Sequence, residues 1–265
     1  MTADAFFLPL GDAREGRFLA TAATRGPWSP DSQHAGPPAA LLGRAVERRP
    51  GAREGFRVVR MTFEILRPVP LGEVTVAVRE AETGRSVERV EAELRAADGR
   101  VAMRVAALRI RVGEAGTAPT VEPPVTVPGP DESPVMSFPL PWDEGYHTSV
   151  ETRFARGSAT EPGPACAWFR MRVPLLPDEE PSGLVRVLVA ADSGNGVSGE
   201  LDIRRHVYVN PDLTVHLRRP PVGEWVGLDA RTAIDEAGIG VADAQLLDAK
   251  GVIGRSAQSL FVNPR

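Results

Sequence analysis

Residues 61–73 of the chain read MTFEILRPVPLGE and residues 213–224 read LTVHLRRPPVGE, so that the two stretches align with a single gap. Each contains a β-compatible segment, an Arg-Pro step and then Gly-Glu. Further on, residues 98–101 align in the same register with residues 250–253. A repeat at a spacing of about 150 residues is too long for a solenoid unit, so it indicates a duplicated domain.

Each half carries one amphipathic helix ahead of its strands. The first is predicted from Gly36 to the break at Pro50, with prolines in its first turn. The second is predicted to begin near Ser182, where an apolar stripe at i, i+3, i+4 and i+7 follows, and to break or bend at residues 193–196. One helix followed by an antiparallel meander, twice over, predicts an α+β fold with a sheet wrapped around a helix in each half.

The meander in each half is predicted from three β-compatible segments. These segments are residues 74–79, 86–94 and 101–112 in the first half and residues 225–232, 239–247 and 252–262 in the second.

A proline-rich stretch separates the halves. Eight of the 25 prolines fall between Pro119 and Pro141. Proline cannot donate a hydrogen bond to a strand ladder, and it fixes the backbone angle φ, so this stretch is neither a helix nor a central strand. We therefore predict an N-terminal domain over residues 1–115, a linker over 116–140 and a C-terminal domain over 141–265.

The composition excludes several classes of protein. Apolar residues make up 42% of the chain and charged residues 25%, which is typical of a folded globular protein. A net charge of −4 argues against nucleic acid as a partner, and no apolar run reaches the length of a membrane span. The N-terminus lacks the pattern of a secretory signal and Cys166 is the single cysteine, so we expect a cytoplasmic protein. The four histidines show no metal-ligand spacing, and we expect no metal.

Asp192 is the most informative polar residue. It follows Leu188 by four residues and therefore falls on the face of the second helix that should be buried. A buried carboxylate needs hydrogen-bond partners or a raised pKa. A catalytic carboxylate fits this position, and so does one that caps the helix end or binds the amides of the next loop.

Gln258 shares one strand face with two small residues, Gly254 and Ser256, where a helix could approach closely. Its amide both donates and accepts, so it could orient a water molecule or a carbonyl group. A satisfied core amide and an outward-facing polar residue are the alternatives.

Asn210 and Thr214 are predicted to share one strand face with Asp212 and His216. The functional interpretation places Asn210 or Thr214 beside Asp192, where either could help to hold water. A solvated strand face is the alternative.

The entry to the first helix, at His34 and Gly36, is the third candidate feature. A glycine just before a helix leaves backbone N–H groups free, and together with the helix dipole these could polarise a carbonyl oxygen. An ordinary loop with a surface histidine is the alternative.

Four segments, in this order, resemble the TesB-like (type II) acyl-CoA thioesterases. They are HAGPPAALL at residues 34–42, FEILRPVP at 63–70, NPDLTVHL at 210–217 and GVIGRSAQSL at 251–260. The resemblance covers about residues 15–263. It implies a double hotdog fold, in which two helix-in-sheet domains act as one pseudo-dimer. It also implies an acyl-CoA or acyl-carrier thioester substrate, and no cofactor is required.

The resemblance also implies a set of site residues. The family's aspartate falls on Asp192 and its glutamine on Gln258, while the position of its threonine or serine falls on Asn210. We therefore expect Asp192, Asn210 and Gln258 to be catalytic, with Asp192 as general base and the other two fixing the attacking water. His34, Gly36 and Thr214 are the expected substrate-binding residues.

Two other functions remain open at this stage. Because Asn210 stands where a hydroxyl is usual, the chain could be a non-catalytic acyl-binding protein. A hotdog hydratase or dehydratase is the other candidate, and it would need a histidine and a carboxylate in one cavity. The sequence does not decide between CoA and a carrier protein, the acyl length, the pathway or whether the chain forms a homo-oligomer.

Overall fold

The first half of the chain folds around helix α1 (Gly36–Arg48), which confirms the predicted position of the first helix. The computed structural model describes residues 4–116, 118, 120 and 125–265. The strands of this half are β1 (Phe7–Pro9), β2 (Arg17–Ala20), β3 (Phe56–Ile65), β4 (Gly72–Thr83), β5 (Val87–Ala96) and β6 (Val101–Arg111). The two short strands β1 and β2 were not predicted.

The second half is built around helix α3 (Gly183–Ala191), which starts directly after its cap Ser182 as predicted. A separate turn, α4 (Gly194–Val197), follows where the break was expected, and α2 (Tyr146–Ser149) precedes the strands. The strands are β7 (Val150–Arg156), β8 (Ala165–Met171), β9 (His206–Val209), β10 (Asp212–Leu217), β11 (Val226–Ile234), β12 (Ile239–Asp248) and β13 (Gly251–Pro264). Of these, β7, β8 and β9 were not predicted.

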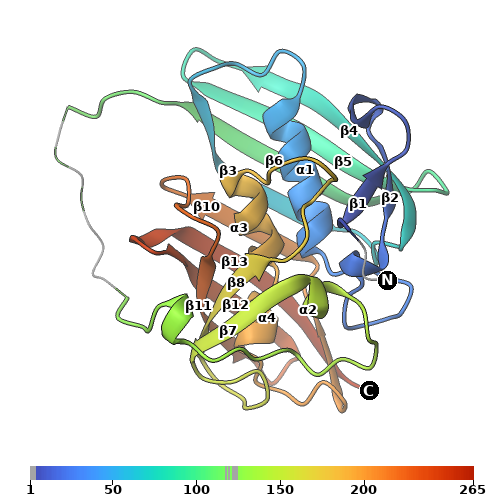
Figure 1. Cartoon of the computed structure of the whole chain (residues 1–265), viewed down its shortest axis with the longest axis vertical. Helices are drawn as coiled ribbons and strands as arrows, with labels where there is room; N and C mark the ends of the chain where they lie inside the picture. The colour runs from blue at the N-terminus through green and yellow to red at the C-terminus, as the bar shows by residue number, and fades with distance from the viewer. Residues whose placement is uncertain (1–3, 117, 119, 121–124) are drawn as a thin grey trace.

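All these strands belong to one sheet. Its order is β1-β2-β4-β5-β6-β3-β10-β13-β12-β11-β8-β7, and β9 pairs with β13. The two halves therefore join edge to edge through β3 and β10, and α1 and α3 lie side by side against the sheet (Figure 1). This arrangement confirms the predicted double hotdog architecture.

The joint between the halves has the symmetry of the sequence repeat. Thr62 pairs with Thr214 across β3 and β10, and these two residues are equivalent in the repeat. On either side, Met61 pairs with Val215 and Phe63 with Leu213, as a two-fold axis between equivalent strands requires. The duplicated halves thus associate as the two subunits of a symmetric dimer would.

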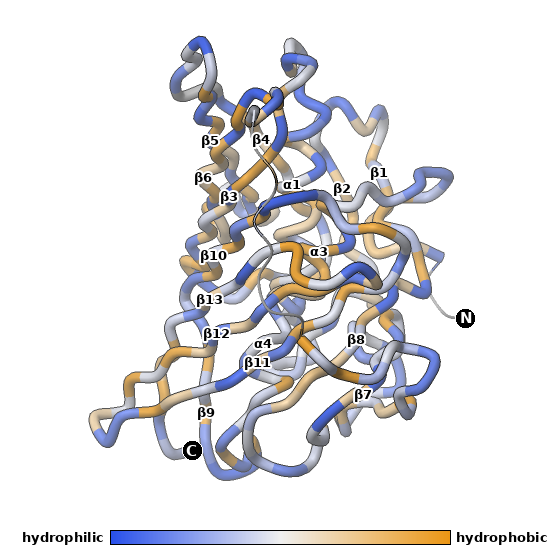
Figure 2. The backbone as a smooth tube through the Cα atoms, turned by 90° about the vertical axis from the view of Figure 1, so that its left-hand side faces the viewer, coloured by the Kyte–Doolittle hydropathy of each residue, from blue (hydrophilic) through white to orange (hydrophobic). Residues whose placement is uncertain are grey.

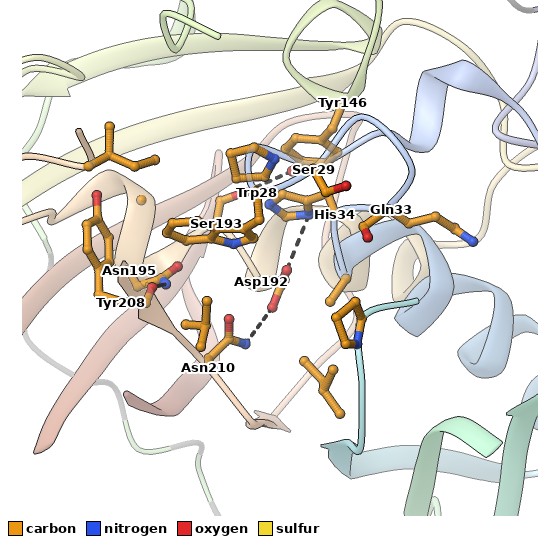
Figure 3. Close-up of a pocket in the computed structure, with 18 of the residues that line it drawn as sticks. Trp28, Ser29, Gln33, His34, Tyr146, Asp192, Ser193, Asn195, Tyr208 and Asn210 are labelled. Carbon is orange, nitrogen blue, oxygen red and sulfur yellow. Dashed lines mark hydrogen bonds and ion pairs between the residues drawn. The ribbon is translucent and has the colours of Figure 1, made fainter. Parts of the chain in front are cut away.

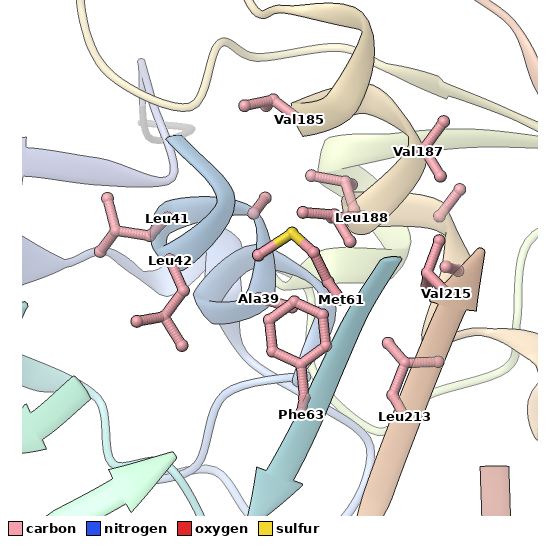
Figure 4. Packing of buried hydrophobic residues seen from close by; sticks show 14 of the residues in the cluster. Ala39, Leu41, Leu42, Met61, Phe63, Val185, Val187, Leu188, Leu213 and Val215 are labelled. Atoms are coloured by element: carbon pink, nitrogen blue, oxygen red, sulfur yellow. The ribbon is translucent and has the colours of Figure 1, made fainter. Parts of the chain in front are cut away.

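The core lies between the paired helices and the inward face of the sheet. Along β5, buried side chains alternate with more exposed ones, and the same alternation of apolar and polar residues runs along the strands in Figure 2. In Figure 4, Leu42 on α1 and Leu188 on α3 pack over Phe63 and Leu213 of the two central strands, and all four side chains are fully buried. Burial of this continuous apolar layer is what holds the two halves together.

The segment before β7 packs on the second half. Trp168 Nε1 donates to the carbonyl oxygen of Pro128 at 2.9 Å, and Met136 donates its N–H to the carbonyl of Thr152 at 3.0 Å. Residues 117, 119 and 121–124 of the predicted linker lie outside the described residues. These contacts show that the segment from residue 128 onward packs on the second half. The domain bounds stay a prediction.

None of the helices in the described residues is both long enough and apolar enough to cross a membrane.

Candidate active site

A cavity of about 620 Å³ opens between the two halves. Both halves line it, and apolar and aromatic side chains form most of its wall (Figure 3). The polar lining includes His34, Asp192 and Asn210, three of the residues that sequence reasoning singled out. A cavity of this size and character is typical of a small-molecule site.

The packing of the two helices brings Asp192 to this cavity. A Cβ built on Gly36 would lie 2.4 Å from the Val189 carbonyl oxygen, whereas one on Gly43 would contact Leu184 and Leu188 earlier in α3. The helices are therefore antiparallel, and the start of α1 meets the end of α3. Asp192, the C-cap residue of α3, stands against the positive end of α1.

Asp192 is buried and extensively hydrogen-bonded. Its Oδ1 accepts from Asn210 Nδ2 at 2.8 Å and from Gln258 Nε2 at 3.2 Å. Burial nevertheless raises the pKa of this carboxyl from 3.8 to about 7, against the lowering effect of these amides and of the backbone N–H groups of Ala35 and Gly36. Asp192 thus changes protonation close to neutral pH, as a general base should.

His34 faces the other oxygen of this carboxyl. Its Nδ1 lies 3.3 Å from Asp192 Oδ2, and its ring stacks on Tyr146 with 3.8 Å between the ring centres. Burial lowers the pKa of His34 to about 3, so the imidazole is neutral. Tyr146 is held in turn, because its hydroxyl donates to the Val189 carbonyl at 2.8 Å and lies 2.9 Å from Ser193 Oγ.

Gln258 reaches the cluster from β13, and both the nitrogen and the oxygen of its amide form hydrogen bonds. Nε2 donates to the Asp192 backbone carbonyl at 3.0 Å as well as to its carboxylate, and Oε1 accepts from the N–H of Asn195 at 3.0 Å. The side chain is buried behind Asp192 and is not part of the cavity wall. Both hydrogens of Nε2 are thus directed to Asp192, and the role of Gln258 in holding the attacking water stays a prediction.

Asn210 and Thr214, which were expected on one strand face, lie in different places. Asn210 lies in the bend between β9 and β10, where it donates to Asp192 and to the carbonyl of Asp212. Thr214 is on β10, on the opposite sheet face from the buried Leu213, with its hydroxyl 3.4 Å from that of Thr62. Thr214 is not in the cavity wall, so the geometry does not support the prediction that it binds substrate.

Gly36 also differs from its predicted role. Its N–H donates to His34 Nδ1 at 3.1 Å and, with that of Ala35, it stabilises the charge on Asp192. Because Pro37 and Pro38 have no N–H, no free donor remains in the first turn to polarise a substrate carbonyl. The expected oxyanion site at Gly36 is therefore occupied by the protein's own groups.

The close approach at Gly36 can be tested by stability. Gly36→Ala is expected to lower the free energy of unfolding by about 1–3 kcal/mol, because the added methyl group would collide with the backbone of α3. Gly113→Ala is the matched control, since an added Cβ there meets nothing within 4 Å. Chemical denaturation measures both, and equal values for the two variants would contradict the assigned contact.

Three residues of the cluster were missed in the sequence. Tyr146 and Ser193 position His34 and the end of α3, and Asn195 fixes Gln258 through its backbone N–H. No spacing in the sequence joins them to Asp192. Only Ser193 and Asn195 carried a signal, as part of the predicted helix break.

Comparison with known families decides what this site belongs to. The acyl-CoA thioesterase C-terminal domain matches residues 130–262, and the acyl-CoA thioesterase N-terminal domain matches residues 24–110. The chain belongs to the acyl-CoA thioesterase family. It is therefore a thioester hydrolase, and the predicted resemblance is confirmed. A search of curated proteins finds no match to the chain.

Solved structures agree with this fold. A protein assigned as a thioesterase II from Thermobifida fusca YX is 18% identical, with a TM-score of 0.75, over 98% of this chain and 96% of its own. A hot dog fold protein from Alicyclobacillus acidocaldarius is 17% identical, with a TM-score of 0.74, over 99% and 97%. The acyl-CoA thioesterase II TesB2 of Mycobacterium marinum is 14% identical, with a TM-score of 0.67, over 94% of both chains.

Proposed function

We propose that this thioesterase hydrolyses acyl-CoA by direct attack of water, with Asp192 as the general base. The observation that carries the proposal is the Asp192 carboxylate itself, which lies in the wall of the cavity between the halves with a pKa of about 7. A base of that pKa is ionised in part at neutral pH and still binds a proton well.

The reaction needs one proton to move twice. Asp192 takes a proton from water as the oxygen attacks the thioester carbonyl carbon, and a tetrahedral intermediate forms. When the intermediate collapses, the carbon–sulfur bond breaks and the proton on Asp192 passes to the departing thiolate. The products are a carboxylic acid and free CoA, and Asp192 is again a carboxylate.

The neighbours of Asp192 divide the remaining work. Asn210 uses its Nδ2 on Asp192 and Asp212, so its Oδ1 is the group that would accept a hydrogen bond from the attacking water. Gln258 acts through Asp192 and is a positioning residue in this scheme. His34 Nδ1 lies 3.3 Å from the second carboxylate oxygen, and because it accepts the N–H of Gly36 it can bond Asp192 only when the carboxyl is protonated and donates to it.

A free-thiol release assay across a panel of acyl-CoA chain lengths tests the proposal. We expect release of one thiol per acyl group for at least one chain length, with acyl-CoA as the substrate in preference to a carrier-protein thioester. Acyl-CoA that binds but is recovered unchanged after long incubation would instead support the non-catalytic acyl-binding function.

The pH profile is the second test. We expect kcat/KM to rise with pH through a midpoint of about 7 and then to level off, because only the ionised Asp192 accepts a proton. Steady-state rates between pH 5 and 9, a range of about two units on either side of that midpoint, measure the profile.

Asn210→Ala provides the control for this assignment. It removes a donor that favours the carboxylate, so the midpoint should move to higher pH. A rate independent of pH across the range, or an unmoved midpoint in Asn210→Ala, would contradict Asp192 as the titrating base.

A hydratase is the second candidate, and one contact favours it. The 3.3 Å approach of His34 to Asp192 puts a histidine and a carboxylate in one cavity, as that chemistry requires. Incubation with an α,β-unsaturated acyl-CoA would show hydration as loss of the enoyl absorbance without release of thiol. Thiol release with the enoyl absorbance retained in the acid product would exclude it.

A further inference from the structure

The sequence repeat makes two arginines equivalent, and in the described part of the chain only one of them is bound by a carboxylate. Arg67, before Pro68, is equivalent to Arg219, before Pro220. In the second half, Arg219 binds the carboxylate of Asp248 in a bidentate manner, with Nη2 donating to Oδ1 at 2.7 Å. Nη2 also donates to the carbonyl of Gly251 at 3.2 Å. That guanidinium is thus neutralised by an almost fully buried partner.

Arg67 has lost this partner. The same register that aligns residues 98–101 with 250–253 places Ala96 where the second half has Asp248. Among the described residues Arg67 forms no hydrogen bond or ion pair, and its Nε is buried without a partner. Asp98 interacts with Arg67 through space, but its carboxylate hydrogen-bonds Arg100 at 2.6 Å. Arg67 is therefore a cation that, among the described residues, has no directly bound carboxylate.

The position of Arg67 points to a ligand. It lines the same cavity as His34, Asp192 and Asn210, and it is the one arginine or lysine among the described residues that line it. Its side chain is only partly exposed. Its buried Nε–H has no acceptor from the described residues of the protein, which is costly unless a bound molecule supplies one.

We propose that Arg67 binds a phosphate group of the CoA portion of the substrate. This proposal rests on the proposed function, because acyl-CoA is the substrate that would bring phosphate to this cavity. A planar guanidinium with free N–H groups matches phosphate oxygens in geometry and charge. Arg67 would then select for CoA, while the apolar wall accepts the acyl chain and Asp192 the thioester.

Direct binding tests this subsite separately from hydrolysis. Titration of the protein with free CoA, followed by calorimetry, should give a Kd about tenfold or more higher for Arg67→Ala than for the wild type, the loss expected for one charge-assisted contact. Arg67→Lys should retain part of the affinity, since the charge remains. Pantetheine, which lacks phosphate, should bind both proteins equally.

Arg104→Ala is the matched control. Arg104 belongs to the same half, is well exposed and pairs with Glu64 at 3.3 Å, away from the cavity wall. Its loss should leave the Kd for CoA unchanged. A Kd for Arg67→Ala no higher than that for Arg104→Ala would overturn the proposal.

A second variant tests the argument from the repeat without removing the arginine. Ala96→Asp should recreate the Arg219–Asp248 pair in the first half, and neutralising Arg67 should raise the Kd for CoA as Arg67→Ala does. Ala96→Asp can therefore test the CoA subsite even if Arg67→Ala does not fold. An unchanged Kd for CoA in a folded Ala96→Asp protein would count against the subsite.

Kinetics separate the sources of the anion. Arg67→Ala should raise KM for acyl-CoA and leave KM for the matching N-acetylcysteamine thioester unchanged. If the variant instead impairs only thioesters whose acyl group ends in a carboxylate, the anion is on the acyl chain and the phosphate assignment is wrong. Binding without hydrolysis in the wild type would defeat the proposed function and leave the CoA subsite intact.

Discussion

Asp192→Asn should lower kcat by about 100-fold or more, the usual scale for removal of a general base. The change replaces a carboxylate by an amide of nearly the same shape, so the cavity and the contacts of Asn210 and Gln258 with Oδ1 can persist. What disappears is the group that takes the proton from water. Thiol release with the best substrate of the acyl-CoA panel measures the loss.

Asp243→Asn is the control for this substitution. Asp243 is an exposed aspartate on β12 that pairs with Arg231 at 3.0 Å, away from the cavity. The Asp243→Asn variant should keep the wild-type kcat. Turnover in Asp192→Asn close to that of Asp243→Asn would show that Asp192 is not the base.

Stability supplies a second measurement on the same variant. The folded-state pKa of Asp192, about 7, lies above its ordinary value of 3.8. The stability that this carboxyl contributes is therefore fully present below pH 3.8 and is lost as the pH rises through about 7. The free energy of unfolding of Asp192→Asn should lack this decline, which urea denaturation at several pH values would reveal.

Gln258→Ala should lower kcat by about 10- to 100-fold with a smaller effect on KM. The amide does not touch the cavity, so the loss comes from the freedom that Asp192 gains when two hydrogen bonds to it disappear. The pH midpoint should rise as well, because one donor to the carboxylate is gone. Initial rates as a function of pH and of acyl-CoA concentration measure all three effects.

The same variant should also be less stable by about 1–3 kcal/mol, since the N–H of Asn195 loses its buried acceptor. Gln245→Ala is the matched control, because Gln245 lies on β12 among the charged residues outside the cavity. If both glutamine variants keep wild-type kcat and pH midpoint, Gln258 does not position the base.

The sequence by itself determined the architecture of this protein. The repeat around Arg67-Pro68 and Arg219-Pro220 predicted a duplicated domain, and its register makes Thr62 equivalent to Thr214. Helix positions also followed, because prolines and a Ser cap mark helix starts locally. Such signals need only neighbouring residues, so they can be detected in the linear chain.

Part of the candidate site could also be predicted from the sequence. Helical spacing put Asp192 on the buried face, strand alternation put Gln258 on the face of Gly254 and Ser256, and the family resemblance paired the two residues across 66 positions. The pairing of their atoms is a tertiary fact, yet each side chain's inward direction is a property of its own helix or strand.

Only the tertiary structure decided which hydrogen-bonding groups of the site pair with one another. The start of α1 meets the end of α3, so the amides at Gly36 serve Asp192 and His34 and are not free for substrate. The bend before β10 turns Asn210 into the cavity, while Thr214 faces the other side of the sheet. Hydrogen bonds act over about 3 Å, and folding alone determines which distant segments come that close.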